Sequence, residues 1–200
     1  MYLFGANGHG KVVVEIAELL DLTIDGIIDN APISHELFGY PILSNIPNNC
    51  KELFISIGDN ATRKNIAIQN LSINFPTLIH PKASISKRAK IAQGTVVMSG
   101  VSINSEVKVG KHCIINTNSS LDHECKIGDY VHISPNVALA GNVEVGEGTH
   151  IGIGASVIQG IKIGKWCTIG AGAVIIKDIP DGATVVGNPG KIIKIKDINV

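Results

Sequence analysis

The chain has 200 residues, of which 44% are hydrophobic but only 4% aromatic, and it contains 22 glycines. With so few Phe, Tyr and Trp, an aromatic-rich β-sandwich is excluded, and a regular fold built from Ile, Val, Ala and Leu is indicated. Seventeen basic side chains balance seventeen acidic ones, so no overall field attracts a nucleic-acid polymer or an anionic membrane surface.

The N-terminal segment MYLFGANGHGKVVVEIAELL lacks the basic start and the cleavage site of a signal peptide, and no apolar run reaches membrane-spanning length. The four cysteines form no CxxC pair and no zinc-ligand spacing. Without a secretion signal, we interpret them as reduced thiols and expect a cytoplasmic protein that does not insert into membranes.

Residues 1–76 have the alternating pattern of a small α/β (Rossmann-like βαβ) domain. Apolar runs predict strands over 2–5, 23–29 and 53–57, and helical spacing predicts helices over 11–20 and 61–71. Strands that alternate with helices form a parallel sheet, and ligands bind beyond the carboxyl ends of its strands. Those ends carry the candidate ligand-binding residues Gly8, His9 and Gly10, then Asp29 and Asn30, then Gly58, Asp59 and Asn60, of which Asp59 or Asn60 can cap the second helix.

The turn after the first strand, GANGHG, has the spacing G-x-x-G-x-G rather than the G-x-G-x-x-G of a dinucleotide fold. Glycines at a helix N-terminus still let the backbone approach a phosphate group closely. About 75 residues are too few for a full dinucleotide-binding domain, so a mononucleotide diphosphate suits this unit better. His9 either contacts the bound ligand or is a turn residue without a role in binding, which its glycine neighbours allow.

A strict six-residue repeat fills the second half of the chain. Every sixth residue from Ile79 to Ile175 is aliphatic, seventeen in a row without an insertion. Four residues after each, the chain mostly has a small or β-branched residue; Cys113, Cys125 and Cys167 stand there and are expected as packing residues. A period of six suits a three-faced prism in which each hexad forms one short strand and one corner. Glycine often follows the aliphatic residue. We expect both sets to point inward, residues eighteen apart to stack, and glycine or Asn to tolerate the turn conformation.

Three of the seven histidines are expected to point out of the prism. His123 lies between the inward residues Leu121 and Cys125, so it stands on a face or an edge. His132 and His150 are eighteen residues apart and share one outward column. An outward imidazole is either a solvated surface side chain or, being neutral at pH 7, a general base or a metal ligand.

Motifs along the whole chain resemble the PglD/NeuD family of bacterial sugar acetyltransferases, which are hexapeptide-repeat enzymes. The motifs are YLFGANGHGKVV, IIDN, FISIGDNATRK, LIHPKA, INTNSSLDHECKIGDYVHISP, LAGNVEVGEG, IGAGAVIIKDIPDG and VVGNPGK. The combination of the GHGK turn, the D-H-E-C segment and the terminal GNPGK is specific, whereas the repeat alone is much less so. The resemblance implies a left-handed parallel β-helix for residues 77–200 that binds acetyl-CoA, preceded by a nucleotide-sugar-binding domain over residues 1–76.

The resemblance also implies a homotrimer with three acetyl-CoA sites in grooves between neighbouring prisms, and no metal. The acceptor would be the amino group of a nucleotide-linked amino sugar, such as a UDP-4-amino-4,6-dideoxy sugar, used for surface glycan synthesis. His123 would act as general base in a direct transfer, supported by Glu124. Because consecutive strand residues point to opposite faces, we expect Glu124 to act through a neighbouring chain or water rather than to touch its own His123.

The resemblance assigns further residues by their motifs. To acetyl or CoA binding it assigns His132, Asn116, Gly141, Ile153 and Ala171, the last three as strand residues that contribute backbone groups only. To the nucleotide sugar it assigns Gly8, His9 and Gly10 at the phosphates, Asp29 and Asn30 near the base or ribose, and Gly58 and Asn60 in the same crevice. Lys177, Lys191 and Lys194 are either CoA-phosphate contacts or a solvated basic tail.

Two other functions stay open. The same family includes sialic acid O-acetyltransferases that share the H-E-C pattern, although the PglD-like segments favour an amine acceptor. A non-catalytic hexapeptide trimer with a histidine-ligated metal between chains is the second, because His132 and His150 share a column. The sequence names neither the sugar nor its nucleotide base.

Overall fold

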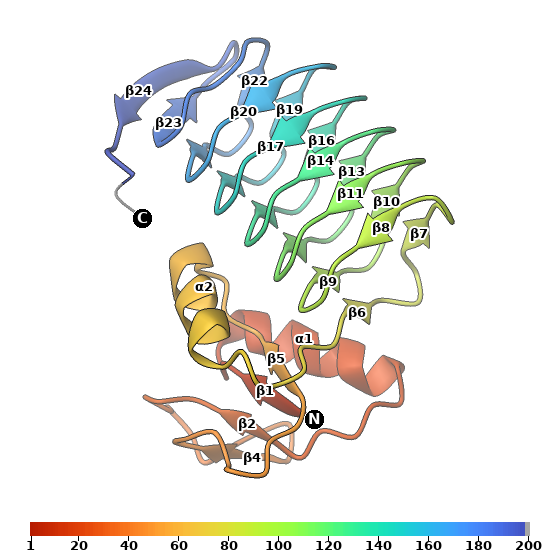
Figure 1. Ribbon diagram of the computed structural model, residues 1–200, viewed down its shortest axis with the longest axis vertical. Coiled ribbons are helices and arrows are strands. Elements are labelled where there is room, and N and C mark those ends of the chain that lie inside the picture. The colour runs from red at the N-terminus through yellow and green to blue at the C-terminus, as the bar shows by residue number, and fades with distance from the viewer. Residues whose placement is uncertain (199–200) are drawn as a thin grey trace.

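A computed structural model of the chain describes residues 1–198 and shows a small α/β part beside a long three-sided prism of short strands (Figure 1). Among these residues, no helix combines the length and the apolar character that crossing a membrane requires. The chain passes from the α/β part to the prism at β6 (Leu78–Ile79).

The α/β part contains the expected parallel strands and one hairpin that the sequence pattern did not indicate. The strands are β1 (Tyr2–Phe4), β2 (Gly26–Ile28), β3 (Glu36–Leu37), β4 (Tyr40–Leu43) and β5 (Leu53–Ile55), in the order β3-β4-β2-β1-β5. β3 and β4 form the hairpin, and β4 pairs parallel with β2. The partly exposed YPIL of β4 contains a proline and no apolar alternation, which is why no strand was expected there.

Both predicted helices are present. α1 (Gly8–Leu19) begins three residues earlier than expected, so Gly8, His9 and Gly10 are its first turn rather than a loop. Position 10 requires glycine because a Cβ there would collide with the carbonyl oxygen of Gly5. α2 (Asn60–Gln69) is capped by Asp59, whose carboxylate accepts a hydrogen bond from the Thr62 amide at 2.8 Å.

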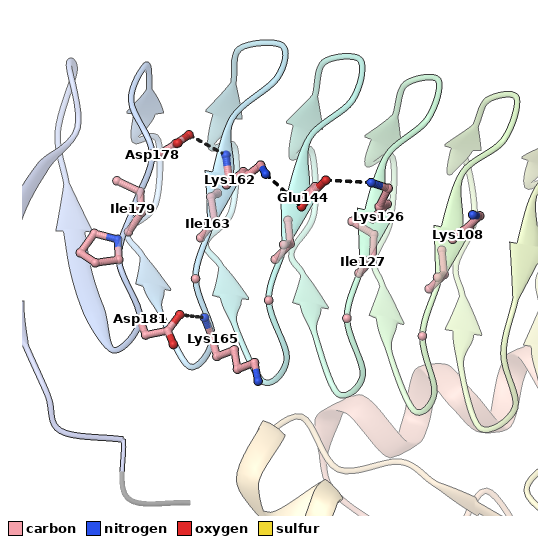
Figure 2. Close-up of a pocket in the computed structure, with 17 residues that line it drawn as sticks. Lys108, Lys126, Ile127, Glu144, Lys162, Ile163, Lys165, Asp178, Ile179 and Asp181 are labelled. Carbon is pink, nitrogen blue, oxygen red and sulfur yellow. Dashed lines mark hydrogen bonds and ion pairs between the residues drawn. The ribbon is translucent and has the colours of Figure 1, made fainter.

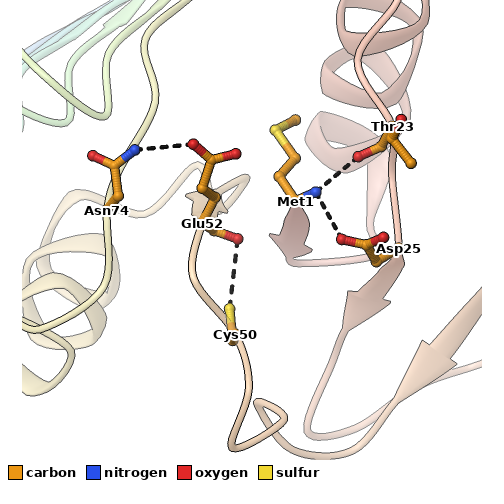
Figure 3. A network of polar contacts seen from close by, with 6 residues as sticks. All are labelled: Met1, Thr23, Asp25, Cys50, Glu52 and Asn74. Carbon is orange, nitrogen blue, oxygen red and sulfur yellow. Dashed lines mark hydrogen bonds and ion pairs between the residues drawn. The ribbon is translucent and has the colours of Figure 1, made fainter.

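A polar network joins the segments at the amino ends of the parallel strands (Figure 3). The Met1 amino group donates to the Thr23 carbonyl and to the Asp25 carboxylate, both at 2.8 Å. Asn74 Nδ2 donates to Glu52 Oε1 at 3.1 Å. These bonds stabilise the edge of the sheet that lies away from the predicted ligand site.

The prism has three faces, as the six-residue period predicts, and the strands of successive coils pair parallel within each face. The first, here called the docked face, contains β6, β9 (Val96–Val97), β12 (Ile114–Ile115), β15 (His132–Ile133), β18 (His150–Ile151) and β21 (Thr168–Ile169), extended by β23 (Ala183–Val186) and β24 (Lys191–Ile195). The small-residue face contains β7 (Ser84–Ile85), β10 (Ser102–Ile103), β13 (Ser120–Leu121), β16 (Ala138–Leu139), β19 (Ser156–Val157) and β22 (Val174–Ile175). The lysine face contains β8 (Lys90–Ile91), β11 (Lys108–Val109), β14 (Lys126–Ile127), β17 (Glu144–Val145) and β20 (Lys162–Ile163).

The inward columns form one continuous aliphatic core. Aliphatic and small residues from Val97 onward are buried in a single cluster that includes the three expected cysteines. Burial raises the pKa of the Cys113 thiol to about 12, so the thiol stays protonated and acts as a packing group. Ile79, also expected inside, is 36% exposed because it belongs to the first strand of the prism.

Two kinds of glycine shape the corners, for different physical reasons. The second corner residue has a positive φ, which Glu124 (62°) and Asn142 (55°) adopt as well as Gly160 (73°). A glycine that directly follows an inward aliphatic residue of the repeat has no positive φ: a Cβ on Gly128 would lie 2.7 Å from the backbone nitrogen of Glu147 in the next coil. The expectation that glycine or Asn tolerates the turn conformation is confirmed at Gly160 and Asn142, whereas a glycine such as Gly128 permits close stacking of the coils.

Arg63 of α2 joins the α/β part to the docked face. Its side chain is 1% exposed; Nε donates to the His112 carbonyl at 2.7 Å and Nη2 to the Tyr130 carbonyl at 2.9 Å. Further bonds go to Asn60 Oδ1 and to two carbonyls of the β5–α2 loop. Asn60 in turn donates to the Gly148 carbonyl at 3.0 Å. One buried guanidinium thus bonds the α/β part to two coils and sets the orientation between them.

This contact also buries histidines close to a fixed positive charge. Burial first, and Arg63 second, lower the pKa of His9 and the pKa of His112 to about 4. His9 Nε2 and His112 Nδ1 are buried without a hydrogen-bond partner among the described residues. Both rings are therefore neutral at pH 7, and charging them works against the contact.

We expect the protein to lose stability on acidification from pH 6.5 to about pH 4. In this window the unfolded chain takes up protons at His9 and His112, whereas the folded chain does not, so stability falls as the pH falls. At pH 5 each histidine lowers the free energy of unfolding by about 2 kcal/mol. Urea unfolding across this range measures the slope, and His112→Gln should reduce it. A free energy of unfolding that does not change with pH would contradict the buried, neutral state of these rings.

Candidate active site

His123 and Glu124 form a hydrogen-bonded pair at the corner between β13 and β14. His123 Nδ1 lies 3.0 Å from Glu124 Oε2, and both side chains are 58% exposed. When Nδ1 donates its proton to a carboxylate, Nε2 carries the lone pair of the ring. A neutral imidazole held in this way is the form that a general base requires.

The expectation that Glu124 does not touch its own His123 is wrong. Neither residue lies in a strand, because they are the two residues of a corner, and Glu124 has a φ of 62°. The left-handed conformation interrupts the alternation of side chains between opposite faces. Both side chains therefore point outward and meet.

Neighbouring coils hold the imidazole in place. A Cβ at Gly141 would collide with the His123 ring, so the ring lies directly against the backbone of the next coil. Asp122 Oδ1 accepts from the His123 amide and from Asn104 Nδ2, both at 2.7 Å, and the Asn104 bond above all keeps the pKa of Asp122 below its usual range. Glycine at position 141 thus makes room for the His123 side chain.

His132 lies on the docked face, where Asn116 determines its tautomer. Asn116 Oδ1 accepts from the Thr117 amide at 2.8 Å, so Asn116 Nδ2 faces His132 Nε2, at 3.2 Å. Nε2 is therefore the acceptor and Nδ1 carries the proton. Burial above all lowers the pKa of His132 to about 3, and a hydrogen bond to the Gly58 backbone opposes the shift.

His150 stacks on His132 with ring centroids 4.7 Å apart and planes 4° apart, and the two are direct partners in the ladder, as expected. Ser134 Oγ lies 2.8 Å from His150 Nε2, so both stacked rings use Nε2 within the chain. The α/β part packs on the first coils of this face, and its Gly58 backbone bonds to His132, which therefore lies at the junction of the two parts, whereas His150 is exposed. Within residues 1–198, no group of three or more His, Cys, Asp or Glu is arranged to hold a metal ion.

A pocket of about 370 Å³ opens at the carboxyl ends of β1 and β2, and Gly8, Lys11, Asp29 and Glu36 are among its lining residues. Gly8 has open space where a Cβ would stand. The Asp29 carboxylate is held by two backbone amides, each at 3.0 Å. Two of the predicted nucleotide-binding residues therefore meet here, together with the cation of Lys11.

The remaining nucleotide-sugar candidates are placed differently. Asn30 is exposed next to Asp29, and Gly10 is buried against β1. His9 is close enough to His132 for its charge to lower the pKa of that ring, so it lies at the junction with the prism. Gly58 and Asn60 belong to the same junction.

Gly141, Ile153 and Ala171 are corner residues, not strand residues as expected. Ile153 and Ala171 share the corner column between the docked and small-residue faces, and Ile153 is 52% exposed. Gly141 belongs to the corner column of His123. The three candidate phosphate-binding lysines, Lys177, Lys191 and Lys194, are all exposed, the last two on β24.

One chain does not bring His123 beside the predicted acetyl-binding residues His132 and Asn116. His132 and Asn116 belong to the docked face, whereas His123 stands at the corner between the other two faces. That corner is the one that the docked face does not share. A site that contains His123 beside His132 therefore requires more than one chain.

Sequence reasoning missed Arg63, which organises the junction behind His132. A signal was present, since Asn60, Arg63 and Ala67 are spaced as one helical face and are the buried residues of α2. It also missed Asp122, Asn104 and Ser134, whose partners stand sixteen or eighteen residues away. The spacing of eighteen residues between stacked positions was enough by itself to pair Asn104 with Asp122.

Comparison with known proteins covers both parts of the chain. Residues 1–69 match the PglD N-terminal domain, and residues 106–141 and 142–177 each match the bacterial transferase hexapeptide (six repeats). A curated relative, the UDP-N-acetylbacillosamine N-acetyltransferase of Bacillus subtilis, is 40% identical over 110 residues, which are 48% of this chain and 50% of the relative. The match thus spans about half the length of that relative.

Solved structures extend the similarity to nearly the whole chain. PerB from Caulobacter crescentus, in complex with CoA and GDP-perosamine, is 34% identical with a TM-score of 0.90, covering 96% of this chain and 95% of that one. The acetyltransferase domain of PglB from Neisseria gonorrhoeae, in complex with acetyl coenzyme A, is 37% identical with a TM-score of 0.89, covering 96% and 98%. The chain therefore belongs to the PglD family of sugar acetyltransferases, which join a small α/β domain to a left-handed β-helix of hexapeptide repeats.

Proposed function

We propose that the protein is an acetyl-CoA-dependent N-acetyltransferase that acts on the amino group of a nucleotide-linked amino sugar, such as a UDP-4-amino-4,6-dideoxy sugar, for surface glycan synthesis. The observation that carries this proposal is the His123–Glu124 pair, in which a carboxylate that accepts from Nδ1 leaves Nε2 as the ring atom that faces a substrate. Relatives named as N-acetyltransferases of perosamine and of UDP-N-acetylbacillosamine favour an amine over a hydroxyl acceptor. The four free cysteines agree with a reducing compartment, the cytoplasm.

The proposed reaction is a direct transfer. His123 Nε2 accepts a proton from the sugar amine as the amine attacks the thioester carbonyl, and Glu124 stabilises the imidazolium that forms. A backbone amide in the groove stabilises the oxyanion, and His123 then protonates the departing CoA thiolate. No acyl-enzyme intermediate is needed, and the buried, protonated Cys113 is unsuited to form one.

We further propose that the active unit is a homotrimer whose sites lie between prisms. Support comes from the separation of His123 from His132 in one chain, and from the small-residue face that lies between the docked face and the His123 corner. Its outward column is uncharged and mostly small: Ser84, Ser102, Ser120, Ala138, Ser156 and Val174. Packing of this face around a three-fold axis would bring His123 of one chain to the docked face of the next.

In this arrangement each chain binds the nucleotide in its own α/β pocket. Gly8 and the first amides of α1 suit the diphosphate, since helix N-termini favour anions, and Lys11 adds a charge beside them. The sugar would extend toward His132 and Asn116, which together with backbone groups near Gly141, Ile153 and Ala171 would hold acetyl-CoA. The roles of His9, Gly10, Asp29, Asn30, Gly58 and Asn60 in nucleotide-sugar binding remain predictions.

The general-base role is tested by His123→Ala. We expect kcat to fall by about 10²- to 10⁴-fold because the amine loses its proton acceptor, while the Kd for CoA stays unchanged. Thiol release from acetyl-CoA with a panel of nucleotide amino sugars measures turnover, and calorimetry measures CoA binding. Near-normal turnover of the variant would show that His123 is not the base. Absence of thiol release with every amine, but release with sialic acid, would replace N-acetylation by O-acetylation.

The shared site is tested by mixing two inactive variants, His123→Ala and His132→Ala. If each site takes His123 and His132 from different chains, refolding a 1:1 mixture restores about a quarter of the wild-type activity, because random assembly leaves that fraction of sites intact. Size-exclusion chromatography with light scattering confirms the trimer in each sample. Failure of the mixture to recover activity while trimers form would place both histidines in one chain's site.

A further inference from the structure

Three lysines stand in register on the lysine face. Lys108 is paired with Lys90 on one side and with Lys126 on the other, on strands β8, β11 and β14. Neighbouring strands lie about 4.8 Å apart, and like charges directly opposite each other destabilise a sheet. The ammonium groups of this column therefore repel one another unless an anion binds between them.

The chain neutralises only one end of this column. Lys126 donates to Glu144 at 2.8 Å, and Glu144 also lies 3.9 Å from Lys162 (Figure 2). The bond to Lys126 is the main reason that the pKa of Glu144 lies below its usual range. Among the described residues, Lys90 and Lys108 form no ion pair. The unneutralised end is the one nearer the α/β part.

A groove of about 380 Å³ lies beside these two lysines and reaches the corner that carries His123 and Glu124. Arg88, Lys90, Lys108 and Lys126 line it with Glu106, Glu124 and Asn142. Glu124 is the hydrogen-bond partner of His123, and Lys126 is the partner of Glu144, so these two charges are already engaged. Three cations then face one free carboxylate in a groove that borders the His123–Glu124 pair.

We propose that this groove is a phosphate-binding site for the substrate whose reactive end lies at His123. The proposal rests on the proposed acetyl transfer, in which both substrates carry phosphate: the nucleotide sugar as a diphosphate, and CoA in its nucleotide portion. A phosphate between Lys90, Lys108 and Arg88 replaces their repulsion by charge-assisted hydrogen bonds. The three side chains would act on binding and not on the proton transfer.

The groove is distinct from the pocket at Gly8. It is lined by residues of the lysine face and its corner with the small-residue face, whereas the pocket at Gly8 belongs to the α/β part, which packs on the docked face. In the proposed trimer, the docked face of one chain meets the His123 corner of the next, so a ligand held at Gly8 would lie toward the Lys90–Lys108 groove of that neighbouring chain. Each substrate site would then combine the Gly8 pocket of one chain with the groove of the chain that contributes His123.

The test compares Lys90→Gln/Lys108→Gln with Lys162→Gln, a matched change on the same face outside the groove. In the intact protein, calorimetry measures the Kd of CoA, UDP and GDP, and steady-state kinetics measures each KM. We expect the double variant to weaken one ligand by about tenfold or more, with kcat within about twofold, whereas Lys162→Gln changes neither. A higher Kd for CoA identifies CoA as the source of the phosphate, and a higher Kd for UDP or GDP identifies the nucleotide sugar.

Thermal unfolding gives a second readout that needs no turnover. Lys108→Gln should raise the Tm of the ligand-free protein because it removes the central charge of the column, and pyrophosphate should raise the Tm of the wild type more than that of the variant. Unchanged Kd values for all three ligands, together with an equal response to pyrophosphate, would overturn the proposal. Loss of binding in a protein that transfers acetyl to no amine would instead leave the groove in place and overturn only the proposed reaction.

Discussion

The backbone hydrogen bond between successive coils is the interaction on which the rest of the structure depends. The Ile114 amide donates to the Val131 carbonyl at 2.9 Å, and the same step recurs along the prism. It brings residues eighteen apart into direct contact, whatever their chemistry. The stacked rings of His132 and His150, and the lysine column, are consequences of this interval.

The same interval explains how a corner holds an imidazole in place. His123 and Glu124 can meet because the corner conformation turns both side chains outward, and the ring can lie against the next coil because that coil has glycine at position 141. Each feature requires a particular residue at one position of the repeat. A hexapeptide prism is therefore an inert scaffold at most corners and a rigid support for an imidazole at this one.

Arg63 performs a different task, since it determines what the docked face can do. A buried cation is tolerated only when its donors are satisfied, and here carbonyl groups of the loop and of two coils, with Asn60, accept them. The contact that results removes water from His9 and His112 and lowers their pKa values. Packing of the α/β part on the prism thus keeps these two imidazoles neutral at pH 7.

The sequence by itself determined the prism, its core and the alternating α/β unit, because a six-residue aliphatic period without insertions has one regular solution and inward positions follow from it. It also marked His123, since a histidine between two inward residues has to face outward. Only the tertiary structure decided that Glu124 reaches its own His123, because that depends on a φ of 62° and not on side-chain alternation. It alone decided that His9 and Asn60 lie at the junction with the prism, because the orientation of the α/β part depends on contacts such as those of Arg63, between residues 49 and 67 positions apart.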